Sequence, residues 1–177
     1  MADVPVIREP ATREEYRAGL ATISAAWHAG FADIVSDDVL TWMDGLPNRA
    51  LSDQTFDHLT CTGEPLVLVA VDGDAVVGTG SLVTDPGSTK SFVPATDDEI
   101  RTLYVHPERW REGIGTRLLN ELCSACRPEA NRVILETFRD NRRGCQFYES
   151  RGFDRIGSAS FDIAGESYPT VVYAQQQ

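Results

Sequence analysis

The chain has 177 residues, of which 42% are hydrophobic, so it is long enough for one domain over residues 1–177 and apolar enough to form a core. Its longest apolar run, Leu66–Val71, excludes a helix of the ~20 residues needed to span a bilayer. The first residues contain charged side chains and no apolar stretch typical of a secretion signal, so we expect a cytoplasmic protein.

The net charge is −11, with 27 acidic residues against fifteen arginines and a single lysine, Lys90. Residues 101–155 carry a net charge of +3 and the remainder −14, so the central segment is suited to face an anion. So acidic a chain disfavours nucleic acid as a partner. A lysine-poor, acidic composition resembles proteins from organisms with molar salt in the cytoplasm, where a Debye length of ~3 Å screens self-repulsion. A GC-rich mesophilic source is the alternative.

The first part of the chain predicts one short strand and a series of helices. Thr12 followed by Glu15 has the pattern of a capping box, and apolar residues recur after it at helical spacing. The expected elements are a strand at Val4–Arg8, helices from Thr12 to about His28 and over Asp37–Met43, and, after a break at Leu46-Pro-Asn48, a helix from Ser52 to about Thr60.

The rest of the chain alternates strands and helices and predicts a mixed α/β fold. The Asp72-Gly-Asp74 turn predicts a hairpin, because Asp-Gly readily takes positive φ. A strand–helix–strand unit in the middle predicts parallel strands with a right-handed crossover. The expected elements are strands at Leu66–Val71, Ala75–Val83 and Ile100–Val105, a helix at Gly113–Cys126, a strand at Arg132–Phe138, a helix at Arg142–Ser150, and strands at Phe153–Ser160 and Glu166–Ala174.

A glycine-containing loop joins the Ile100–Val105 strand to the next helix. The free N–H groups of a helix's first turn suit a phosphate, and Gly113 and Gly115 let an anion approach the backbone closely. Arg109 and Arg111 add positive charge. The loop lacks the lysine of a Walker motif, and Leu118 stands where a dinucleotide fingerprint has its third glycine. By itself the pattern favours a purely structural strand-to-helix turn.

Longer motifs make the interpretation specific. The segments Glu99–Glu108 and Gly113–Leu119 together resemble the acetyl-CoA motif of the GNAT superfamily of N-acetyltransferases, and Asn141 with Phe147–Phe153 resembles a second motif of that family. This resemblance implies a GNAT fold, with a central mixed sheet of six or seven strands between helices and a splayed parallel pair that holds acetyl-CoA. One departure is Trp110, which stands where the family usually has arginine or glutamine.

The same resemblance implies roles for individual residues. Tyr148 matches the general-acid tyrosine, and Glu99 matches a position where several members keep a general base, with water or a merely solvated acidic loop (Asp97, Asp98) as alternatives. The implied cofactor-binding residues are Leu103, Tyr104, Val105, Arg109, Arg111, Glu112, Gly113, Ile114, Gly115, Thr116 and Asn141. The implied acceptor-side residues are Trp27, His28 and Phe31.

The sequence therefore predicts a direct transfer of acetyl from acetyl-CoA to a primary amine in a ternary complex, with no metal, no membrane and no covalent intermediate. The amine is a small molecule, a lysine or a protein N-terminus, and a homodimer is common in the family. The rival hypothesis is a catalytically silent GNAT-fold module that binds CoA. Cys123 and Cys126 are expected to be partly buried thiols, with a metal or redox role as the alternative.

Overall fold

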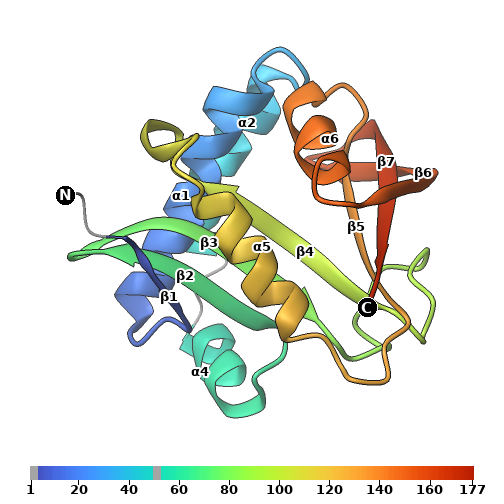
Figure 1. The fold of residues 1–177 in the computed structure, drawn as a ribbon. Helices are drawn as coiled ribbons and strands as arrows, with labels where there is room; N and C mark the ends of the chain where they lie inside the picture. The colour runs from blue at the N-terminus through green and yellow to red at the C-terminus, as the bar shows by residue number, and fades with distance from the viewer. Residues whose placement is uncertain (1–3, 50–52) are drawn as a thin grey trace.

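A seven-stranded sheet forms the centre of the computed structural model, which describes residues 4–49 and 53–177. The strand order is β1-β2-β3-β4-β5-β7-β6, and every neighbouring pair is antiparallel except β4 and β5 (Figure 1). The strands are β1 (Val6–Arg8), β2 (Leu66–Asp72), β3 (Ala75–Val83), β4 (Asp98–Val105), β5 (Arg132–Phe138), β6 (Asp154–Ile163) and β7 (Glu166–Gln176). The predicted mixed sheet of six or seven strands and its parallel central pair are confirmed.

Helices cover both faces of the sheet, with α5 on one face and α1 on the other (Figure 1). The helices are α1 (Arg13–Phe31), α2 (Asp37–Asp44), α3 (Leu46–Arg49), α4 (Asp53–Thr62), α5 (Ile114–Ser124) and α6 (Arg142–Glu149), with a 3-10 turn η1 (Pro107–Arg109). Thr12 caps α1 as expected, because its Oγ1 accepts a hydrogen bond from the Glu15 N–H at 3.2 Å. The Glu15 carboxylate accepts from Ala11 N and pairs with Arg8, which ties β1 to the helix.

The prediction that Leu46-Pro-Asn48 breaks the second helix is wrong. The chain leaves α2 at Gly45 and forms α3 directly afterwards, with Pro47 in its first turn. A proline is tolerated there because the first-turn N–H groups have no acceptor within the helix. The predicted start of the next helix at Ser52 lies outside the described residues.

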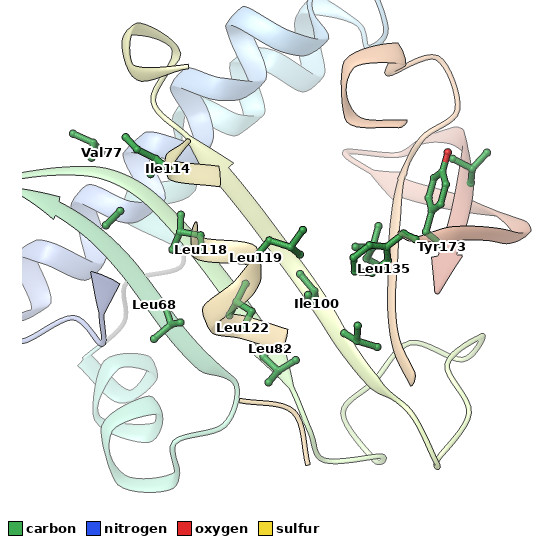
Figure 2. Packing of buried hydrophobic residues seen from close by; sticks show 14 residues of the cluster. Leu68, Val77, Leu82, Ile100, Ile114, Leu118, Leu119, Leu122, Leu135 and Tyr173 are labelled. Carbon is green, nitrogen blue, oxygen red and sulfur yellow. The ribbon is translucent and has the colours of Figure 1, made fainter. Parts of the chain in front are cut away.

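The core on the α5 face is mostly aliphatic (Figure 2). Leu118 and Leu122 of α5 are entirely excluded from solvent against β3. Two glycines of β3 make this contact close: a Cβ at Gly78 would lie 2.9 Å from Leu118 Cδ1, and one at Gly80 would lie 2.7 Å from Leu122 Cδ1. Burying each leucine contributes about 1.5–3 kcal/mol, so this helix–sheet contact anchors the fold beneath the glycine loop.

Strands β4 and β5 pair only at their first residues, where Asp98 lies opposite Val133 and Glu99 opposite Ile134. Arginines neutralise the acids at this junction: Arg127 Nε donates to Asp98 at 2.6 Å, and Arg132 Nη2 donates to Asp97 at 2.6 Å. Both aspartates are buried, so the alternative of a solvated acidic loop is wrong. From this clamped junction the two strands diverge toward α6 (Figure 1).

Candidate active site

A pocket of about 510 Å³ lies where β4 and β5 diverge. One wall is β4 from Ile100 to Tyr104, and the opposite wall is β5 from Leu135 to Phe138. The pocket extends to both faces of the sheet, because its lining also includes Tyr148 of α6 and aromatic residues of α1. The further lining residues are Leu20, Ile23, Trp27, Phe31, Trp42, Met43, Leu46, Lys90, Asn141, Phe161, Asp162, Ile163, Ala164 and Thr170.

The glycine loop begins at the end of β4 and leads into α5. Gly113 is the N-cap residue with φ 80°, and a Cβ built on it would meet nothing within 4 Å, so the space above the loop is open. The first intrahelical bond runs from Arg117 N to Gly113 O, which leaves the N–H groups of Ile114, Gly115 and Thr116 without acceptors inside the helix. These three groups and the helix dipole form a site suited to a phosphate.

The charged residues around this loop have different surroundings. Arg109 donates to Asp72 at 2.6 Å and to Glu112 at 2.8 Å, so both Arg109 and Glu112 are engaged in holding the loop to the β2–β3 turn. Arg111 has φ 70° and makes no ion pair with any residue in the described part of the chain. Arg111 is therefore the loop arginine available to an anion.

The contacts of Trp110 show what this residue does at the position where the family usually has arginine or glutamine. Its indole Nε1 donates to the carbonyl of Val105 at 2.7 Å, and the guanidinium of Arg143 stacks over its ring at 4.1 Å. The tryptophan thus fixes the loop to the end of β4 and holds an additional arginine nearby. At the other end of the loop, Arg151 donates to Thr116 Oγ1 at 2.6 Å, so the Thr116 hydroxyl has a protein partner.

The three residues predicted to bind the cofactor arm, Leu103, Tyr104 and Val105, form the half-buried end of the divergent strand. They pair with β3 on one side, whereas β5 has left the other side. An extended ligand arm can therefore add to β4 as a further strand. Burial raises the pKa of Tyr104 to about 12, so its phenol stays protonated at neutral pH.

Tyr148 lies in the pocket wall, as its predicted role requires. Its ring contacts Phe147 and Phe153 with centroids 5.2 and 5.9 Å away, and this burial raises the pKa of its hydroxyl well above the ordinary value. The described residues offer the hydroxyl no hydrogen-bond partner. Tyr148 thus carries a protonated hydroxyl in the lining of the pocket.

Glu99 and Glu136 differ in their access to the pocket. Glu99 is buried at the β4–β5 junction, outside the lining, where it accepts hydrogen bonds from Arg101 Nη2 at 2.8 Å and from the backbone of Lys90 at 3.0 Å. Glu136 lies in the lining, and its Oε2 accepts from Thr170 Oγ1 at 2.8 Å. Its Oε1 pairs with the ammonium of Lys90.

Sequence reasoning missed Glu136, although a signal was present. It is a charged residue that directly follows the apolar run Val133–Leu135 within a predicted strand. Such a residue rarely lies inside a sheet without a partner.

The other predicted residues are divided between the pocket and the surface. Trp27 and Phe31 line the pocket, and the Nε1 of Trp27 is buried with no hydrogen-bond partner of ordinary geometry among the described residues. His28 lies outside the lining, where its Nε2 pairs with Asp44 at 2.7 Å. Asn141 lines the pocket and also caps α6, because its Oδ1 accepts from Gly144 N at 3.0 Å.

The cysteines are free thiols, and Cys123 and Cys126 are partly buried as expected. Burial raises the pKa of Cys123 to about 11 and that of Cys126 to about 12, which makes both poor nucleophiles at neutral pH. Within residues 4–49 and 53–177, no group of three or more His, Cys, Asp or Glu side chains is arranged to hold a metal ion. The same residues contain no helix with the length and apolarity to cross a bilayer.

Comparison with known proteins agrees with this geometry. A model of the acetyltransferase (GNAT) family matches residues 19–153, more than half of the chain, so the chain belongs to this family of acyltransferases. The N-alpha-acetyltransferase RimI of Mycobacterium tuberculosis (strain ATCC 25618 / H37Rv) is 37% identical over 79 residues, which are 44% of this chain and 49% of that protein. The chain thus matches about half the length of this curated relative.

Solved structures share the fold over nearly the whole chain. The PaiA N-acetyltransferase of Thermoplasma acidophilum, in complex with coenzyme A, has a TM-score of 0.72 at 19% identity and covers 97% of this chain and 98% of its own. A ribosomal-protein-alanine N-acetyltransferase of Brucella melitensis has a TM-score of 0.67 at 24% identity, with 97% and 99% covered. At these identities the likeness shows the fold alone.

Proposed function

We propose that the protein is an N-acetyltransferase that moves an acetyl group from acetyl-CoA directly to a primary amine. The observation that carries this proposal is the divergence of β4 and β5, which opens a pocket with the amide loop of α5 at the end of β4 and Tyr148 in its wall. Acetyl-CoA would supply the activated thioester, and the chain would supply binding, orientation and proton transfer.

The residues of the loop fit the anionic end of acetyl-CoA. The N–H groups of Ile114, Gly115 and Thr116 would bind the pyrophosphate, with Arg111 as the nearby cation. The unpaired side of β4 at Leu103–Val105 would bind the pantetheine arm. Gly113 matters because its open surface lets a phosphate reach the backbone.

Two groups of the pocket are suited to move protons during the transfer. Tyr148, protonated at neutral pH, would donate a hydrogen bond to the departing sulfur and give up its proton as negative charge develops there. Glu136 would accept the proton of the attacking ammonium, because it is the partly buried carboxylate that faces the pocket. Glu99, suggested by the family resemblance, is the rival base.

A matched pair of substitutions distinguishes these two carboxylates. Glu136→Gln is expected to lower kcat/KM by about 10²-fold, with the largest loss at low pH, where less of the amine is already neutral. Glu99→Gln is expected to act mainly on stability, because it weakens contacts to Arg101 and to the backbone of Lys90. If the low-pH loss appears with Glu99→Gln instead, Glu99 is the base.

For the acceptor we propose a protein or peptide N-terminus. RimI of M. tuberculosis is an N-alpha-acetyltransferase by name, and it matches this chain over part of its length. A small-molecule amine remains the second class of acceptor.

The test is an acceptor screen in which free CoA thiol is measured. Peptides with different first residues are compared with polyamines and amino sugars, and acetyl-CoA binding is measured by calorimetry on the same sample. Acetylation of peptide α-amines is the expected result. Tight acetyl-CoA binding without turnover on any amine would instead establish the rival function, a silent CoA-binding module.

A further inference from the structure

The chain places its own single lysine inside the pocket. Lys90 lies in the loop between β3 and β4, and its ammonium pairs with Glu136 Oε1 and lies 4.9 Å from the ring centroid of Phe161. The ring of Phe92 is a second aromatic neighbour at 6.0 Å. An acidic side chain and aromatic faces are the groups that recognise an alkylammonium ion.

The position of Lys90 is fixed by its backbone as well as by its side chain. Its N–H donates to Glu99 Oε2 at 3.0 Å, and Glu99 is in turn held by Arg101 Nη2 at 2.8 Å. Arg101 also donates to the carbonyl of Ser88, two residues before Lys90. The loop is therefore clamped to β4, and the lysine side chain is aimed into the pocket by a network of contacts.

Lys90 occupies the place of an acceptor amine. Glu136 has one oxygen engaged by Thr170 Oγ1, and Lys90 pairs with the other. Under the proposed function, Glu136 is the group that binds and deprotonates the acceptor. The Lys90 nitrogen therefore has the base, the general acid Tyr148 and the cofactor slot around one pocket.

Position 90 differs from the other basic positions of the chain in being a lysine. Fifteen of its sixteen basic residues are arginine. Arginine is the better partner for a buried carboxylate, because it binds in two-point geometry and is weakly hydrated. Unlike lysine, it stays charged and offers no neutral amine to an acyl donor. The one lysine of the chain thus stands in the lining of the pocket.

We propose that Lys90 is an internal acceptor, so that the protein acetylates its own Lys90 Nζ in cis. This inference rests on the proposed function. Glu136 takes one proton from the Lys90 ammonium, and the freed nitrogen attacks the thioester carbonyl carbon of acetyl-CoA. A C–N bond forms and the C–S bond breaks. The thiolate takes the Tyr148 proton, and the second proton that the nitrogen loses restores the Tyr148 phenol, so Glu136 holds the one proton released overall. The products are Nε-acetyl-Lys90 and CoA, and no oxidant or metal is consumed.

Acetylation of Lys90 would change the pocket. An acetylated lysine is neutral and cannot pair with Glu136, so the carboxylate becomes free for an external amine. The first turnover on Lys90 would thereby open the acceptor site.

The experiment incubates the full chain with acetyl-CoA and no external amine, followed by intact-mass measurement and peptide mapping. The expected result is one added acetyl group on Lys90, formed at a rate constant that does not change when the protein is diluted. Lys90→Arg keeps a cation for Glu136 and is expected to gain no acetyl group at this position. Tyr148→Phe is expected to slow the modification by about 10²-fold. Protein purified already acetylated at Lys90, but unmodified in the Tyr148→Phe variant, supports the proposal equally.

Two results would overturn the inference while the acetyltransferase function stands. One is an unmodified Lys90 in a sample that binds acetyl-CoA and acetylates peptides. The other is a modification rate that rises in proportion to protein concentration, which means one molecule acetylates another. A sample that shows no acetyl-CoA binding by calorimetry would overturn the proposed function and this inference together.

Discussion

The two faces of the central sheet are packed in different ways. On the α5 face, mostly aliphatic side chains pack together, and Leu118 and Leu122 are excluded from solvent (Figure 2). On the α1 face, the rings of Trp27, Phe31 and Phe138 meet edge to face, with centroids 5.0–5.4 Å apart. The pocket opens beside these rings, and every residue that lines it lies outside α5.

This difference indicates that one face of the sheet mainly stabilises the fold and that the other mainly forms the pocket. The closed face provides most of the packing that stabilises the fold, because its leucines exclude solvent entirely. The aromatic face cannot close where β4 and β5 diverge, and the space left there is available to substrates. Substitutions on the two faces should therefore differ in what they change.

The largest expected effect is on stability. Leu118→Ala should lower the free energy of unfolding by about 3–5 kcal/mol, because it leaves a cavity in the closed face. Leu20→Ala is the matched variant on the pocket face, and we expect a loss of about 2 kcal/mol or less, since water can enter its space. Urea denaturation of both variants measures the difference. Equal losses would contradict the proposed division between the faces.

The next largest effect is expected on kcat, from a substitution of Tyr148 in α6. Tyr148→Phe should lower kcat by about 10²-fold with acetyl-CoA affinity unchanged, because it removes the proton donor but little volume. Tyr173→Phe is the control, since Tyr173 is buried outside the pocket lining and its hydroxyl donates to Glu149 at 2.8 Å. The control should lose stability and keep kcat. Similar kcat values for wild type and Tyr148→Phe would reduce Tyr148 to a packing role.

A smaller effect is expected at the glycine loop. Gly113→Asp adds a side chain and a negative charge where a pyrophosphate would lie, so acetyl-CoA affinity should fall by more than about tenfold, or ~1.4 kcal/mol. Gly63→Asp, after α4, is the control, because Gly63 also has positive φ and open space around it. Calorimetry should show normal affinity for the control. Normal affinity in a folded Gly113→Asp variant would remove the loop from the cofactor site.

The smallest expected effect concerns the charge of the whole chain. Residues 101–155 carry +3, whereas the remainder carries −14 and should repel an anionic cofactor over long distances. Between ~0.1 and ~1 M KCl the Debye length falls from about 10 to about 3 Å, which screens this repulsion more than the short contacts of the loop. Melting temperature and kcat/KM should both rise over this range. A fall in melting temperature and in cofactor affinity would identify an ordinary low-salt protein.

The sequence predicted the local elements well because their signals are local. Thr12 and Glu15 start α1 through contacts between neighbouring residues, and the leucine spacing of α5 follows from one turn of a helix. The error at Leu46-Pro-Asn48 has a local cause too. Proline either breaks a helix or begins one, and the choice depends on Gly45 ending α2 just before it.

The sequence by itself also determined the family and the parallel strand pair, since these depend on motifs contiguous along the chain. Only the tertiary structure decided which carboxylate faces the pocket. Glu99 is turned into the β4–β5 junction, while Glu136 meets Lys90 from a loop 46 residues away along the chain. That pairing depends on the path of the β3–β4 loop over the diverging strands, and no spacing in the sequence encodes such a path.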